Sequence, residues 1–301
     1  MTQPETLRYT IPTGPRPDNY TVLKPGAGHF SLGRHVNHDP QSRRYPFRAA
    51  AATLAAVYHE RHVPIFDQGQ LGSCTGNAGL GILATGPYWN DLSVGQQGGG
   101  LAGGRYTWDE DGAKQLYSDV TADDDFPGQW PPSDTGSDGL SVGKELVKRG
   151  VILGYQHTFD LTSALAALQQ FPLLVGTVWT DRMFYPDALG RIGISGPVDG
   201  GHEWIVDEFV PPGYISRGGS VLSTIEACIG GTTSWSAAFG VAGRFYLTTT
   251  NFGKLLKQDG DVMVLTPPTA PAPTPEPVPG EGPTAADVAA KVRQLLTDLG
   301  L

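Results

Sequence analysis

Apolar and polar positions along residues 49–265 follow patterns that predict both helices and strands. Residues 141–150 and residues 162–170 have apolar positions at helical spacing, with Ser141 as a capping residue and Gly150 as a stop for the first. Four other stretches are rich in β-branched and aromatic residues, as strands are. They are residues 173–177, 203–210, 221–229 and 244–248. Because most strands come late, the pattern predicts an α+β fold with a helical first part and a β-rich second part.

The composition of the chain excludes several classes of protein. At 301 residues and 39% hydrophobic, the chain can bury a sizeable core. Its 41 glycines and 25 prolines indicate a loop-rich protein rather than a helical bundle, and the glycine-rich residues 95–104 predict a loop. The net charge of −9 argues against a general nucleic-acid binder. Only two cysteines are present, which excludes a disulfide scaffold and a Cys-rich zinc fold.

No targeting or membrane segment is predicted. The first ten residues contain no apolar run, so we expect no signal peptide and a soluble protein made in a reducing cytoplasm. The longest nearly apolar run, residues 49–58, has about half the length of a membrane span.

Charge and composition divide the chain into four predicted parts. Residues 1–48 carry seven basic and three acidic side chains and form a basic N-terminal arm, and residues 49–265 form the main domain. Residues 266–283 are a Pro-rich linker, which should be an extended spacer. Residues 284–301 predict an amphipathic helix that docks on its own domain, on a copy of itself or on a protein partner. Its apolar face consists of Val288, Val292, Leu295, Leu296 and Leu299.

Two features could suggest metal ions but favour simpler interpretations. The acidic stretch 109–138 lacks the ligand spacing and turn glycine of a calcium loop, which favours a solvated loop. Two histidine pairs, His35 with His38 and His59 with His62, have no cysteine or carboxylate cluster beside them in the sequence, which favours surface histidines. We expect neither a metal ion nor an organic cofactor.

The segment DQGQLGSCTGNAG carries the most informative chemistry. Cys74 follows Ser73 at the start of a run of small residues, so we expect its thiol at a helix N-terminus, where the helix dipole favours a thiolate. The Cys74 backbone N–H and the side-chain amide of Gln68 are donors that can hold an oxyanion. The segment GGHEWIVDEFV supplies His202 as a base at the start of a strand.

With a third segment, TTSWSAAFGVAGRFYL, these segments resemble the papain-like cysteine peptidases. That family shows a QG…GSC segment, a GH that opens a strand, and an NSWG motif, in this order. Gln68 and Cys74 have the family spacing, and His202 follows Cys74 at close to the family interval. The third segment is in register at Thr233, Ser234, Trp235, Ser236, Phe239, Gly240 and Gly243.

The resemblance covers roughly residues 60–265 and implies a two-lobed α+β fold. A helical lobe would carry the cysteine, a β-rich lobe the histidine, and substrate would lie in the cleft between them. Cys74 would be the nucleophile and His202 its partner in a thiolate–imidazolium pair, with Gln68 in the oxyanion hole. The implied reaction is hydrolysis of peptide bonds in a peptide or protein substrate.

Some positions depart from the family pattern or support the cleft. Thr233 stands where the family has the asparagine that orients the histidine, and Trp235 would shield that contact from water. Ser73 and Gly201 are expected to support the cleft. Only 73 residues precede Cys74, too few for a long inhibitory pro-region, so release of such a segment is not expected, whereas a shorter arm over the cleft stays open.

Two alternatives to a peptidase stay open. The threonine and the C-terminal helix are compatible with a catalytically weak or inactive structural or binding module of the same fold. A transglutaminase-like or deamidating activity on the Cys–His site is the other. The segments GSCTGNA, GGHEW, GRHVNHDPQSRRYP and PPSDTGSDGLSVGKELVKRGVI are similar to a subset of the family from bacteria and their bacteriophages. That similarity implies a virion-associated protein, such as a minor tail protein.

Overall fold

The computed structural model describes residues 8–10, 21–23, 30–38, 40–44, 46–47 and 53–268. The chain divides into two units, residues 1–268 and residues 269–301. The second unit lies outside the described residues, and so do most of the predicted linker and the whole predicted C-terminal helix. Their structure therefore stays a prediction.

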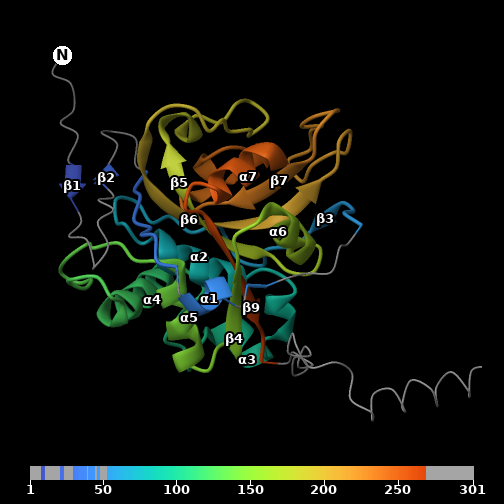
Figure 1. Cartoon of the computed structure of the whole chain (residues 1–301). Coiled ribbons are helices and arrows are strands. Elements are labelled where there is room, and N and C mark those ends of the chain that lie inside the picture. Colours follow the sequence, from blue (N-terminus) through green and yellow to red (C-terminus); the bar gives the residue numbers. More distant parts are fainter. Residues whose placement is uncertain are drawn as a thin grey trace, which may run out of the picture. The chain divides into compact units, whose positions relative to one another are not determined.

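An antiparallel sheet of seven strands forms the centre of the first unit (Figure 1). Its order is β4-β9-β5-β6-β7-β8, with β3 pairing with β6 beside this path. The strands are β3 (Val57–Tyr58), β4 (Gly154–Thr158), β5 (Leu173–Thr180), β6 (Val198–Val210), β7 (Cys228–Thr232), β8 (Arg244–Thr248) and β9 (Asp261–Thr266). Two short strands, β1 (Arg8–Thr10) and β2 (Thr21–Leu23), pair in a separate sheet.

Central strands of this sheet are buried on both faces. Neighbouring residues of a strand point to opposite sides of the sheet, so they pack into different hydrophobic cores. On β6, Trp204 and Val206 belong to one hydrophobic core, and Ile205 between them belongs to the other. On β5, Val175 belongs to the same core as Trp204, and Leu174 belongs to the same core as Ile205. The sheet therefore separates two cores, and helices cover each face.

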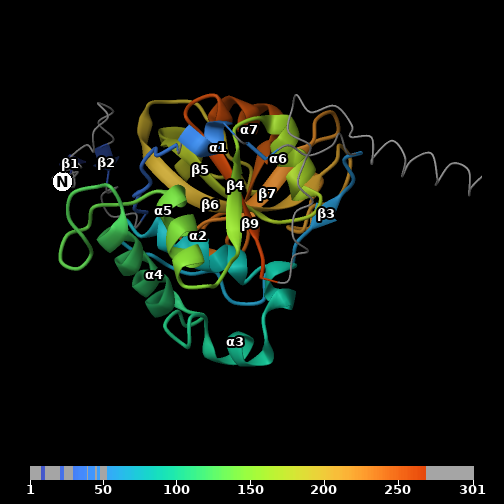
Figure 2. The same ribbon diagram turned by 60° about the horizontal axis from the view of Figure 1, so that its bottom comes forward.

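One core lies under helices from the first part of the chain and the other under helices from the second (Figure 2). The first group includes α2 (Cys74–Leu83), α4 (Glu110–Asp123) and α5 (Gly139–Lys148). The second group is α6 (Leu161–Leu168) and α7 (Thr249–Leu256). The remaining helices are short: α1 (Pro40–Arg44), α3 (Val94–Gly99), η1 (Tyr88–Asp91), η2 (Asp181–Phe184) and η3 (Ser236–Ala238). This arrangement is the predicted α+β fold.

Three predicted element boundaries are wrong for identifiable reasons. The helix predicted over residues 141–150 with Ser141 as its cap starts at Gly139, because Asp138 is the cap and its side chain accepts from the Ser141 N–H. Residues 221–229 were expected to form a strand, but β7 starts at Cys228 because Val210 pairs with Cys228 and the connection takes up residues 211–227. The expected loop 95–104 contains α3 instead, because Ser93 and Gln96 form a capping box that starts a helix despite the glycines.

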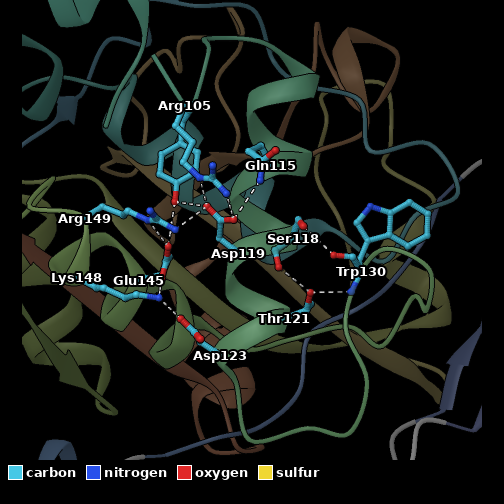
Figure 3. Close-up of polar contacts among 11 residues, drawn as sticks. Arg105, Gln115, Ser118, Asp119, Thr121, Asp123, Trp130, Glu145, Lys148 and Arg149 are labelled. Carbon is cyan, nitrogen blue, oxygen red and sulfur yellow. Dashed lines mark hydrogen bonds and ion pairs between the residues drawn. The ribbon is translucent and has the colours of Figure 1, made fainter. Parts of the chain in front are cut away.

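The acidic stretch 109–138 is also not simply a solvated loop, because its first half is α4 and an ion-pair network joins α4 to α5 (Figure 3). Asp119 on α4 accepts hydrogen bonds from Tyr106 (2.8 Å) and Arg105 (2.5 Å). Arg149, after α5, lies 3.3 Å from Asp119 and donates to Glu145 at 2.6 Å. The acidic residues thus fasten two helices of the lobe that carries Cys74.

Candidate active site

Cys74 is the first residue of α2, as the sequence predicts. The whole helix is buried, and at Gly76 it lies so close to α4 that a Cβ would stand 2.5 Å from the Ala113 carbonyl oxygen. Ser73 precedes the helix and does not cap it with its side chain. Instead its hydroxyl and carbonyl oxygens both accept from Asn77 Nδ2, each at 3.0 Å. Close packing and this bond fix the position of the thiol.

Gln68 is held beside the third sequence motif by backbone pairing. Its N–H donates to the Ser234 carbonyl at 2.9 Å, and Asp67 forms an antiparallel bridge with Trp235. The Ser234 hydroxyl donates to Gln68 Oε1, which turns Nε2 of the amide outward as the donor. The sequence analysis gave Ser234 no role, although it lies in the motif. Nε2 donates to the Leu71 carbonyl at 2.7 Å and to the Ser31 carbonyl at 3.1 Å.

His202 lies on β6 and meets Thr233 at the end of β7. The His202 Nε2 and Thr233 Oγ1 atoms are 2.5 Å apart, so the threonine contacts the histidine as the sequence predicts. Trp235 stacks on the imidazole, with ring centroids 4.4 Å apart and planes 19° apart. Trp179 packs edge-on against the same imidazole at 4.9 Å. These rings leave His202 and Thr233 buried away from water.

Burial acts against the charged forms of both the thiol and the imidazole in this closed arrangement. Burial raises the pKa of Cys74 to about 12, although backbone hydrogen bonds from Glu203, Gly33 and Thr75 oppose the change. Burial lowers the pKa of His202 to about 3. Among the described residues, none hydrogen-bonds to His202 Nδ1. Burial therefore favours the neutral form of each group.

A segment of the same chain, residues 30–38, lies in the site, and we call it the strap. Phe30 packs on Trp235 with ring centroids 4.7 Å apart, and the Ser31 carbonyl takes the Gln68 donor. Gly33 reaches the thiol with its backbone, and a side chain there would overlap the Gly72 carbonyl oxygen. The strap thus occupies the groups that would face a substrate.

Backbone hydrogen bonds hold the strap on both sides. Arg34 N–H donates to the Gly201 carbonyl at 3.0 Å, and a side chain at Gly201 would overlap the Arg34 carbonyl oxygen. On the other side, His35 N–H donates to the Ser137 carbonyl at 2.6 Å, and Ser137 N–H donates to Gly33 at 2.8 Å. Gly201 therefore leaves room for the backbone of the strap.

Three expected surface histidines are buried instead, namely His35, His38 and His59. His35 bonds the Thr135 carbonyl at 2.7 Å, and His59 bonds the Leu168 carbonyl at 2.8 Å. Their spacing in the sequence gives no sign of these partners, which come from distant segments. In the part of the chain that the structure describes, no group of three or more His, Cys, Asp or Glu side chains is arranged to hold a metal ion. Over the same residues, no helix is long and apolar enough to cross a membrane.

Sequence reasoning also missed three charged residues next to the site, Arg34, Glu203 and Asp261. Glu203 directly follows His202, and Arg34 lies in the strap. All three are buried. The available signal was the GGHEW segment itself, since a carboxylate beside a histidine on a buried strand needs a partner.

Comparisons with known proteins support the fold. The structure is similar to that of xylellain, a cysteine protease from Xylella fastidiosa, at a TM-score of 0.55 and 14% identity, covering 78% of this chain and 96% of that one. It is also similar to the proform of the ragweed pollen allergen Amb a 11, a cysteine protease, at a TM-score of 0.51 and 15% identity, covering 85% and 70%. No protein-family profile matches the chain. No curated protein matches it either. The chain therefore has the papain-like α+β fold.

Proposed function

We propose that the chain is a papain-like cysteine peptidase whose cleft is closed by the strap in the described state. The observation that carries the proposal is that three distant segments meet in one place with complementary roles. They are the thiol of Cys74 at a helix start, the Gln68 amide oriented by Ser234, and His202 held by Thr233. A buried module without chemistry has no need for an oriented donor beside a thiol.

The reaction follows from these groups once the strap has left. Cys74 gives its proton to His202, and the sulfur attacks the carbonyl carbon of a peptide bond. Gln68 Nε2 and the Cys74 N–H donate to the oxygen that becomes negative. The C–N bond breaks as His202 returns the proton to the leaving amine. Water then attacks the thioester, with His202 as base, and releases the carboxylic acid and the thiol.

In this proposal, departure of the strap forms the ion pair. While the strap is bound, burial keeps both groups neutral, and Ser31 occupies the oxyanion donor. Water and substrate reach the site only after the strap moves. The thiolate then gains the helix dipole and the imidazolium as partners, and both lower the pKa of a thiol.

Labelling of the thiol tests the proposal in the full chain. Gly33→Val displaces the strap, because a side chain at position 33 overlaps the backbone of Gly72. We expect iodoacetamide to label Cys74 slowly in the wild type, and rapidly in Gly33→Val already at about pH 5 to 6. His202→Ala in the Gly33→Val background should abolish the rapid labelling. Mass spectrometry separates Cys74 from the other thiol, Cys228.

Gly95→Ala is the control substitution, since its nearest neighbouring atom is 3.9 Å away, and it should label as the wild type does. If Gly33→Val labels only near the free-thiol pKa of about 8.5, and does so without regard to His202, the peptidase proposal is wrong. The second candidate, an inactive module of the same fold, would then stand. The closed site and the threonine in place of asparagine favour that candidate, and a virion protein such as a minor tail protein is the setting that the sequence suggests.

Product mass separates peptide hydrolysis from deamidation. Incubation of Gly33→Val with an unfolded protein should split that protein into fragments whose summed mass exceeds the substrate by one water. A deamidating activity would leave the chain whole.

A further inference from the structure

The side chain of Arg34 enters a buried acidic pocket next to the site. It is completely buried, and its Nη2 donates to the Asp261 carboxylate and, at 2.9 Å, to the Asp259 carbonyl. Its Nε lies 3.9 Å from Glu203 Oε2. His38, also on the strap, bonds Asp261 at 3.2 Å. A guanidinium thus lies between two carboxylates from different strands, β6 and β9.

Glu203 has no hydrogen-bond partner for either carboxylate oxygen among the described residues, although it is completely buried. Two glycines make room for it. A Cβ on Gly139 would lie 2.7 Å from Oε1, and a Cβ on Gly176 would lie 2.8 Å from Oε2. A buried carboxylate is costly unless a charge or a donor satisfies it. Burial and the Asp261 charge raise the pKa of Glu203, and Arg34 is the cation that opposes this change.

The pocket lies within the cleft and not behind it. The backbone N–H that carries this side chain donates to the carbonyl of Gly201, the residue before His202. The preceding strap residue, Gly33, reaches the thiol of Cys74. A peptide that replaced the strap along the same backbone contacts would present a side chain to the same pocket.

Removal of the strap takes Arg34 away and leaves two carboxylates close together with no guanidinium between them. The Asp261 charge and burial raise the pKa of Glu203, and a guanidinium between the two acids opposes that change, as Arg34 does in the closed protein. The geometry suits a guanidinium better than an ammonium, since Arg34 engages a carboxylate and a backbone carbonyl and also faces a second carboxylate. A neutral side chain of the same shape would not replace the ion pair that Arg34 makes with Asp261.

We propose that Asp261 and Glu203 form a specificity pocket that binds the guanidinium of a substrate arginine in place of Arg34. The substrates would be peptides or proteins with arginine at the position that pairs with the Gly201 carbonyl. This inference rests on the proposed peptidase function. It adds the class of substrate and the two residues that select it.

Ligand binding tests the pocket without any need for catalysis. In full-length Arg34→Ala, millimolar ethylguanidinium should raise the melting temperature by about 3 °C, with a much smaller effect of ethylammonium. The wild type, whose pocket is filled, should not respond. Arg34→Ala with Asp261→Asn should not respond either. If Arg34→Ala does not fold, Gly33→Val opens the same pocket and takes its place. Absence of a guanidinium effect, or an equal effect with Asp261→Asn, overturns the proposal.

Specificity is measured on Gly33→Val with pairs of fluorogenic peptides that differ only by arginine against citrulline, its uncharged analogue. We expect arginine to be preferred by about tenfold or more in kcat/KM, and Asp261→Asn or Glu203→Gln to reduce that preference severalfold. Cleavage without an arginine preference overturns this inference and leaves the peptidase function intact. Guanidinium binding without reactive Cys74 or cleavage supports the pocket and overturns the peptidase function.

Discussion

A single hydroxyl, that of Thr233, is bonded to the His202 imidazole at the site. Thr233 Oγ1 is bonded to His202 Nε2 at 2.5 Å, and the other imidazole nitrogen has no hydrogen-bond partner among the described residues. Trp235 and Trp179 enclose this contact, so no water replaces the hydroxyl if it is lost. At the scale of the residue, the Thr233 hydroxyl is thus the hydrogen-bond partner of the buried His202 imidazole.

Thr233→Val, which keeps the shape and removes the hydroxyl, should therefore destabilise the protein. The imidazole would be buried with both nitrogens unpaired, at a cost of about 1–3 kcal/mol in the free energy of unfolding. Denaturant titration at neutral pH measures the change. Thr75→Val is the matched control, because the Thr75 hydroxyl is equally buried and has no hydrogen-bond partner among the described residues. It should change stability by less than about 0.5 kcal/mol. Equal losses in the two variants would contradict the role of the Thr233 hydroxyl.

The position of helix α2 sets the position of the thiol. Gly76 lies against the backbone of α4, and α4 is in turn fastened to α5 by the network around Asp119 and Glu145 (Figure 3). Glycine is used here for close approach and not for an unusual backbone angle, since Gly76 is not among the residues with positive φ. At the scale of the element, packing against a neighbouring helix outweighs the low helix propensity of glycine.

Gly76→Ala should lower the free energy of unfolding by about 1–3 kcal/mol, because its Cβ meets the Ala113 carbonyl oxygen and the backbone N of Tyr117. Gly95→Ala, also inside a helix, meets only one atom at 3.9 Å and should stabilise by up to about 1 kcal/mol through helix propensity. Thermal and denaturant unfolding of the two variants check the difference. A gain in stability for Gly76→Ala would show that α2 and α4 can separate without cost.

The strap covers the site, so that the residues of the site are buried like those of a hydrophobic core. It lies between the Gly201 and Ser137 backbones, and it buries Cys74 and His202 together. Burial of Cys74 and His202 in this way ties their protonation to the free energy of unfolding. The link is strongest for His202, whose folded-state pKa lies far from its unfolded value.

The folded protein should therefore lose stability as the pH falls. Between about pH 6.5 and pH 3, His202 is protonated in the unfolded chain and neutral in the folded protein, because burial lowers its pKa to about 3. The free energy of unfolding then falls by about 1.4 kcal/mol per pH unit from this residue alone. Burial lowers the pKa of His35 and His59 as well, and these add to the slope. Full stability from this group is present above its unfolded pKa.

His202→Gln isolates the contribution, because it removes one titrating group and leaves the other two histidines in place. Unfolding curves measured between pH 6 and 4 give the free energy of unfolding at each pH. Its slope against pH should be smaller in this variant by the amount that corresponds to about one proton bound on unfolding. Identical slopes would mean that His202 is not held neutral in the closed protein.

The sequence alone determined the elements and motifs whose information is local. The helix that starts at Cys74, the strand 244–248, the α+β order and the pairing of Thr233 with His202 all follow from period, spacing and a resemblance carried by three motifs. Elements that depend on the length of a connection could not be placed from pattern alone. The residues before β7 look like a strand, yet the register with β6 makes them a loop.

The tertiary structure alone decided what fills the site. Ser31, Gly33 and Arg34 meet Gln68, Cys74 and Asp261 over sequence separations that no local pattern records. Burial, which only the folded chain provides, raises the pKa of the Cys74 thiol and lowers the pKa of the His202 imidazole. Desolvation and long-range contact are properties of the folded chain, whereas periodicity and spacing are properties of the sequence.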